Sequence, residues 1–215
     1  MRRWLCAVLT IPLLLLCSCG KQPSEEQTAL DLRAALSNAD VCRMTALIHA
    51  DCGGRLYDFA LSCEAGEEET VTVLAPEEIA GVCAKVTEDG TELCFEDVSL
   101  SLGLGEEALS TPLLLPHLLL ECLRSAYIAD TARTDEGAVV RYYHGYGDDR
   151  LELSVTLDRA ALTPLRCELL LDGSVIVSAE ITEFTLQMSE TNRGGNRLGI
   201  SEEDLGRGGP GPTGT

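Results

Sequence analysis

The spacing of apolar side chains changes near residue 41 from helical spacing to alternation, which one later helical segment interrupts. From residue 41 onward apolar and polar positions alternate, as in Leu151, Leu153, Val155 and Leu157 with polar side chains between them. A period of two is typical of strands that bury one face. We expect about nine or ten strands, nearly all joined by short turns, in an antiparallel sheet with one apolar and one polar face.

Glycine-containing dipeptides indicate where the predicted strands turn. They are Gly53-Gly54, Asp89-Gly90 and Asp172-Gly173, and each supplies the positive φ angles that two-residue hairpin loops need. Near the end of the last predicted strand the alternation changes phase, since Phe184 and Leu186 stand at even positions after an odd-numbered apolar series. This change predicts a β-bulge near Thr182-Glu183.

Two segments have helical spacing instead. Ser24 and Gln27 match an S-x-x-Q capping box, and the apolar face that follows includes Leu32 and Leu36, which predicts an amphipathic helix of about 15 residues. Residues 110–127 begin with Thr111-Pro112 and carry leucine on almost every side. A helix of this kind is buried on more than one side, so we expect it across the open face of the sheet as a lid.

The first residues have the features of an export signal. Two arginines precede an apolar run from Trp4 to Cys17, which is too short to cross the roughly 30 Å hydrocarbon core as a helix. The run ends in Leu16-Cys17-Ser18-Cys19, which resembles the lipobox of bacterial lipoproteins. The resemblance implies that residues 1–18 are a signal peptide and that Cys19 carries a diacylglyceryl group.

The expected organisation has four parts. After the signal, residues 19–23 form the lipid anchor and a linker, and residues 24–188 form one folded domain. Residues 189–215, rich in glycine and polar side chains, bury too little to fold and are expected to be a disordered tail. The protein is therefore expected at the cell membrane, lipid-anchored on the extracytoplasmic face.

The charge narrows the choice of partner. The chain has 35 acidic and 16 basic residues, a formal net charge of −19, and loss of Arg2 and Arg3 with the signal would make it −21. Such a chain has no basic surface with which to neutralise phosphates, so we expect no nucleic-acid partner. Anionic lipid would repel it too, so the two acyl chains on Cys19 must hold it at the membrane.

The cysteines after Cys19 are seven in number and mostly stand in apolar strand positions, where cysteine behaves as a small hydrophobe. The pair closest together in a predicted hairpin is Cys83 and Cys94. With Asp89-Gly90 as the loop, position 83 pairs with 96 and position 85 with 94, so Cys83 and Cys94 would be diagonal neighbours, usually too far apart for a disulfide. Most of the thiols are therefore expected to be free and buried.

An N-terminal helix, a bent antiparallel sheet and a mid-chain leucine- and proline-rich helix resemble, in this order, the LolA/LolB-like family of lipoprotein carriers and receptors. The local sequence is similar in four stretches, residues 56–61, 70–77, 89–98 and 181–186. The resemblance implies an α+β fold: a strongly curved antiparallel sheet, or unclosed β-barrel, with an N-terminal helix and a lid helix. The family's carriers are soluble, whereas this chain has an anchor signal, so carrier function is not transferred.

The resemblance also implies a cavity that accepts the acyl chains of a lipid or lipoprotein. Its expected lining comes from the lid and from one strand. These residues are Leu115, Leu118, Leu119, Leu123, Leu151, Leu153 and Val155. The alternative is a non-catalytic scaffold or sensor, of the germination or envelope-stress type, that fills its own cavity and binds an envelope protein.

The sequence offers little for catalysis, and we expect no enzyme, no cofactor and no metal site. Motifs such as G-x-S-x-G or H-E-x-x-H do not occur. The stretch with most chemical character is residues 142–149, with three tyrosines, His144 and two aspartates. It is either a polar-aromatic binding rim, or half of a metal site, or a strand end that turns through Gly145 and Gly147; a hydrolase using His144 is the least favoured reading.

Overall fold

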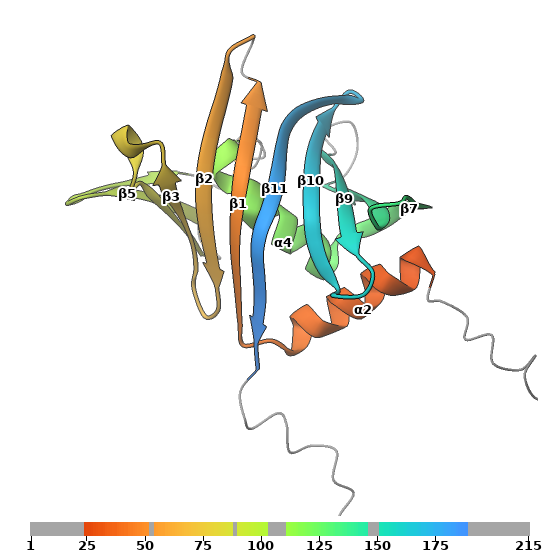
Figure 1. Ribbon diagram of the computed structural model, residues 1–215. Coiled ribbons are helices and arrows are strands. Elements are labelled where there is room, and N and C mark those ends of the chain that lie inside the picture. The colour runs from red at the N-terminus through yellow and green to blue at the C-terminus, as the bar shows by residue number, and fades with distance from the viewer. Residues whose placement is uncertain (1–23, 52–53, 88–89, 103–110, 146–150, 189–215) are drawn as a thin grey trace, which may run out of the picture.

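The computed structural model describes residues 24–51, 54–87, 90–102, 111–145 and 151–188. The predicted signal, anchor and tail lie outside these residues. Strands and two α-helices make up most of the described chain (Figure 1). The elements are α2 (Glu25–Asn38), β1 (Val41–Asp51), β2 (Leu56–Ala65), β3 (Glu69–Ala75), η2 (Glu77–Ile79), β4 (Cys83–Thr87), β5 (Gly90–Phe95), β6 (Val98–Leu102), η3 (Pro112–Leu114), α4 (Leu115–Ser125), β7 (Tyr127–Arg133), β8 (Ala138–His144), β9 (Leu151–Asp158), β10 (Thr163–Leu171) and β11 (Ser174–Gln187).

All eleven described strands belong to one antiparallel sheet, one or two strands more than the alternation predicted. Their order is β6-β5-β4-β3-β2-β1-β11-β10-β9-β8-β7. Strands that follow one another in sequence pair, apart from β6 and β7, and the first strand β1 pairs with the last strand β11 in the centre. Both ends of the order, β6 and β7, remain unpaired with each other. The sheet is therefore curved but not closed, which confirms the expected fold class.

The α4 helix lies across the concave face of this sheet, as Figure 1 shows. It follows η3 on the connection from the edge strand β6 to the opposite edge strand β7. Its leucines at positions 115, 118, 119, 120 and 123 are at most 1% exposed, because the helix is covered by the sheet on one side and by α2 on another. The prediction of a lid buried on more than one side is confirmed.

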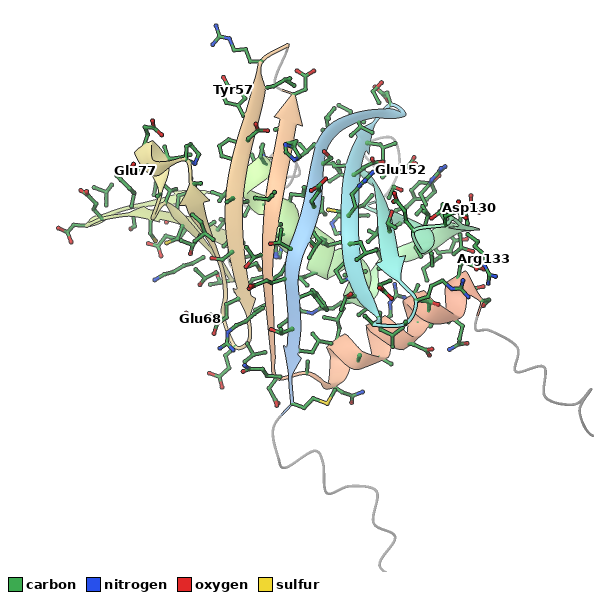
Figure 2. The ribbon with its side chains drawn as sticks, viewed as in Figure 1. Tyr57, Glu68, Glu77, Asp130, Arg133 and Glu152 are labelled. Atoms are coloured by element: carbon green, nitrogen blue, oxygen red, sulfur yellow. The ribbon has the colours of Figure 1, made fainter. Side chains whose placement is uncertain are left out.

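Helix α2 begins where the sequence predicted. Ser24 Oγ accepts a hydrogen bond of 3.1 Å from the backbone N–H of Gln27, while the Gln27 side chain donates to Asp31 Oδ1 at 2.7 Å instead of closing the capping box. Leu32 and Leu36 are buried. At the first turn, Arg133 of β7 pairs with Glu25 at 2.6 Å, and Figure 2 shows Arg133 beside this end of the helix.

Two details of strand register were tested by the structure. Thr45 faces Glu183 and Ala46 faces Ile181, so Thr182 is an extra residue in β11 and the predicted bulge is confirmed. The predicted register of the β4–β5 hairpin was wrong. Thr87 pairs with Gly90, and Cys83 pairs directly with Cys94, because Gly90 is the first residue of β5 and the loop is one residue earlier than the dipeptide rule placed it.

Small side chains in the middle of the sheet make room for the two helices. Ala46 and Ala50 of β1 and Ala179 of β11 are about 1% exposed and belong to the core, as do the buried thiols of Cys42 and Cys167. Since protein interiors are closely packed, small side chains at these positions leave volume for the leucines of α4. The core therefore occupies the concave side of the sheet.

Candidate functional site

The seven residues predicted to line a ligand cavity lie together in the core. Leu115, Leu118, Leu119 and Leu123 of α4 are 0–1% exposed, and Leu153 and Val155 of β9 are equally buried, with Leu151 at 8%. They belong to one hydrophobic cluster that also includes side chains of α2 and the central strands. The side chains of the protein itself therefore fill the space beneath α4.

An apolar pocket of about 250 Å³ opens beside the start of this helix. Strands β2 and β3, the 3₁₀ segment η2 and the turn of η3 form its walls, and Thr111 is the polar residue among those that line it. The lining consists of Phe59, Leu61, Val73, Ile79, Val82, Thr111, Pro112 and Leu113. We call this the apolar pocket. It is somewhat smaller than the roughly 300–1,000 Å³ of sites that enclose a whole small molecule.

A group of charged side chains lies along α4 and contacts β3 and β8. His117 Nδ1 lies 3.0 Å from Glu69 Oε1, and His117 Nε2 lies 3.6 Å from Glu121 Oε2. His144 Nε2 approaches the same Glu121 oxygen at 3.8 Å, and Arg124 pairs with Glu69 at 3.8 Å. We call these five residues the carboxylate–histidine cluster; they tie α4 to β3 and to the end of β8.

The electrostatics of this cluster favour a protonated His117. Burial of the ring lowers the pKa of His117, but the contact with Glu69 and the negative charges of Glu69 and Glu121 outweigh burial and raise it above the ordinary value. The buried Nδ1 atom has no well-aligned hydrogen bond, and its contact with Glu69 is an ion pair. Among the described residues, no group of three or more His, Cys, Asp or Glu is placed to hold a metal ion.

His144 lies at the last position of β8, and Gly145 follows it with a φ of 83°. Tyr143 and His144 border an open hollow of about 610 Å³ whose other walls include Arg33 of α2 and Tyr127 of β7. Tyr142, the third member of this aromatic stretch, is fully buried. Residues 146–150 lie outside the described part of the chain, so the rim interpretation of residues 142–149 stays a prediction.

The described thiols in the core are poor nucleophiles. Burial raises the pKa of Cys42 to about 11 and that of Cys122 to about 12, and it raises the pKa of Cys63 and Cys167 further above the ordinary range. A thiol must lose its proton to attack a substrate. Burial therefore keeps these four core thiols protonated and unreactive.

The helices that the structure describes are all too short or too polar to span a membrane.

No family model matches the chain, and no curated protein is significantly similar to it in sequence. Solved structures are similar in fold. A LolA superfamily protein from Nitrosomonas europaea has a TM-score of 0.46 at 8% identity, with 76% of this chain and 96% of that chain covered. A putative outer membrane lipoprotein-sorting protein domain from Vibrio parahaemolyticus has a TM-score of 0.45 at 11% identity, covering 79% and 97%.

A third similar chain belongs to the structure of the CwlD amidase from Clostridioides difficile in complex with the GerS lipoprotein, with a TM-score of 0.45, 12% identity and coverage of 78% and 98%. The arrangement of one long antiparallel sheet, open at both edges, with an N-terminal helix and a helix across its concave face agrees with what the resemblance implied. In this arrangement the chain is similar to LolA-like proteins.

Sequence reasoning missed two features of this domain. The apolar pocket draws on β2, β3, η2 and η3, and local periodicity gives no signal for a gap between such distant segments. The carboxylate–histidine cluster joins Glu69 to His117 and Glu121. The sequence indicates part of this cluster, since His117 and Glu121 are four residues apart on a predicted helix and therefore share one face.

Proposed function

We propose that the protein is a non-catalytic binding module, held at the extracytoplasmic face of the cell membrane by an acylated Cys19, that receives an acyl chain of a lipid or lipoprotein. The observation that supports this function is the apolar pocket at the start of α4, which is lined almost entirely by hydrophobic side chains and opens to solvent. Ile79 on its border is 36% exposed, and Leu113 is half-buried.

The pocket alone suits one end of an acyl chain, and deeper entry requires movement of α4. Exposing Leu115, Leu118, Leu119 and Leu123 would cost about 6–12 kcal/mol, at about 1.5–3 kcal/mol for each buried side chain. An acyl chain that takes their place returns about 0.8 kcal/mol for each buried methylene. A segment of roughly 8–15 methylenes therefore offsets the displacement, which is the length range of ordinary fatty acids rather than of short ligands.

Native mass spectrometry of the protein released from detergent tests this function. Ile79→Asp places a charge at the border of the pocket and should lower the amount of bound lipid at least tenfold, because burying an unpaired carboxylate is unfavourable. Leu74→Asp is the matched control, since Leu74 is 49% exposed and lies outside the pocket lining. Wild type and the control should retain a mass that disappears on denaturation and matches a lipid.

Equal lipid content in the two variants would contradict the pocket as the binding site. A wild-type protein free of lipid would instead favour the second candidate, a scaffold that binds an envelope protein. That candidate is supported by the filled space beneath α4 and by apolar side chains on the outer strands, where Phe95, Val98 and Leu100 are 43%, 70% and 58% exposed. Crosslinking in intact membranes would then identify its protein partner.

A further inference from the structure

Two cysteines face each other across the outer hairpin of the sheet. Cys83 near the start of β4 pairs directly with Cys94 near the end of β5, on the same row as Thr72 of β3 and Ser99 of β6. Directly opposed residues of an antiparallel pair have Cα atoms about 4.5–5.5 Å apart, and disulfides bridge Cα atoms about 4.4–6.8 Å apart. The backbone of this hairpin already meets the spacing that a disulfide requires.

These two thiols differ from the other described cysteines in exposure. Cys83 and Cys94 are half-buried, whereas Cys42, Cys63, Cys122 and Cys167 are buried in the core. Burial and the neighbouring Cys83 thiol raise the pKa of the Cys94 thiol, in agreement with the facing register of the two residues. A reagent in solution can therefore reach this pair, and reaction at one sulfur places it next to the other.

A second pair of neighbouring cysteines, Cys42 and Cys63, has a different register and serves as a comparison. Cys42 of β1 pairs with Ala65 and Cys63 of β2 pairs with Met44, which makes Cys42 and Cys63 diagonal neighbours on one face. Their side chains are 1% and 3% exposed. Diagonal neighbours are about 7–8 Å apart, beyond the range of an unstrained disulfide, so this pair should remain reduced under conditions that oxidise the facing pair.

We propose that Cys83 and Cys94 form a cross-strand disulfide that staples the β4–β5 hairpin at the edge of the sheet. The oxidant is of the disulfide class. The Cys83 thiolate attacks one sulfur of the oxidant and releases its first thiol; the Cys94 thiolate then attacks Cys83 in the mixed disulfide and releases the second thiol. Two cysteine thiols lose two electrons and two protons, and the oxidant's disulfide is reduced to two thiols.

The disulfide would join two strands in the part of the sheet that the core supports least. Strands β4, β5 and β6 form one end of the strand order and extend away from the helices in Figure 1, and β6 is an edge strand that carries the exposed Val98 and Leu100. A disulfide between β4 and β5 removes conformations of the opened hairpin from the unfolded ensemble. The oxidised protein should therefore exchange the backbone amide hydrogens of β4 and β5 more slowly than the reduced one.

Oxidised glutathione added to the full-length protein in detergent tests the proposal. After excess thiols are blocked with N-ethylmaleimide, trypsin cleavage after Lys85 separates Cys83 from Cys94, so the two peptides stay together only if a disulfide joins them. Since these peptides also contain Cys63 and Cys122, fragment-ion spectra assign the linked sulfur atoms. We expect a Cys83–Cys94 link, with Cys42 and Cys63 unlinked, and loss of the link on reduction.

The variant Cys83→Ser provides the control, because the mixed disulfide on Cys94 then has no neighbouring thiol to resolve it. We expect it to retain one glutathione on Cys94, whereas wild type retains none. Recovery of both cysteines as separate glutathione adducts in wild type would overturn the proposal, as would complete alkylation of both by N-ethylmaleimide or a link between two protein molecules.

Discussion

At the scale of single residues, His117 shows how the fold changes a side chain that the sequence presents as one polar position on an apolar helix. The ring is held between Glu69 of β3 and Glu121 of its own helix, with Arg124 and His144 nearby. These carboxylates raise the pKa of His117 despite burial of the ring. The charged form of this histidine therefore stabilises the contact between α4 and the sheet.

The sign of the pH dependence follows from the direction of the shift. The folded-state pKa of His117 lies above the unfolded value of about 6.5, so its contribution to the free energy of unfolding is complete below that pH and is lost as pH rises through the folded-state pKa. We expect the free energy of unfolding to fall as the pH rises above about 6.5, and the variant His117→Gln to lose part of this fall, measured by urea denaturation at each pH.

His49→Gln is the control for this experiment. His49 also pairs with a carboxylate, Asp58 at 2.7 Å, but both side chains are more than half exposed, so solvent screens the interaction. Its removal should leave the pH dependence unchanged. If the free energy of unfolding depends on pH equally in wild type and in His117→Gln, the Glu69 contact does not couple protonation to stability.

At the scale of elements, one arginine joins the two helices. Arg33 of α2 donates from Nε to the carbonyl oxygen of Leu123 at 3.0 Å and from a terminal nitrogen to that of Ala126 at 2.7 Å. These carbonyls belong to the last turn and the cap of α4, which lack partners within the helix. The positive charge also lies at the negative end of the helix dipole, so Arg33 fixes where the lid helix ends.

Loss of the hydrogen bonds from Arg33 to α4 should lower the stability of the protein. We expect Arg33→Met to lower the free energy of unfolding by about 2–3 kcal/mol, because hydrogen bonds from a charged donor contribute about 1.5–3 kcal/mol and the carbonyls become unsatisfied. Arg43→Met is the matched control: Arg43 pairs with Glu64 at 2.9 Å on the exposed face of the sheet, where such pairs contribute about 0–1 kcal/mol. If denaturant titration shows a similar loss in free energy of unfolding for both variants, the role assigned to Arg33 is contradicted.

At the scale of the whole molecule, the proposed anchor and the acidic charge act in opposite directions. A formal net charge of −19 repels an anionic membrane surface, so the proposed attachment relies on the acyl chains on Cys19. We expect Cys19→Ala to move the protein from the membrane fraction to the soluble extracytoplasmic fraction, and mass spectrometry of wild type to find the diacylglyceryl group on an N-terminal Cys19.

Cys17→Ala is the control for the anchor, since Cys17 is predicted to leave with the signal peptide and alanine is a small residue of the kind the lipobox takes at that position. This variant should remain at the membrane and carry the same lipid as wild type. Retention of Cys19→Ala in the membrane fraction after a high-salt wash would contradict lipid anchoring through that residue.

The sequence by itself determined most of the elements and the face that several of them bury. Alternation along 151–157 predicted the buried residues of β9, the phase change predicted the bulge at Thr182, and the leucine-rich segment predicted a lid covered on several sides. These features are local, because the period of a hydrophobic pattern directly reflects the geometry of one helix or strand and the side that leaves water.

Only the tertiary structure decided which residues meet. The loop of the β4–β5 hairpin lies one residue from its predicted place, which turns Cys83 and Cys94 from diagonal into facing neighbours. The ion pair of Glu69 with His117, the contacts of Arg33 with α4, and the apolar pocket join segments from distant parts of the chain. Hydrophobic periodicity carries no information on these long-range contacts, because they depend on the curvature of the sheet and on how the side-chain volumes fit together.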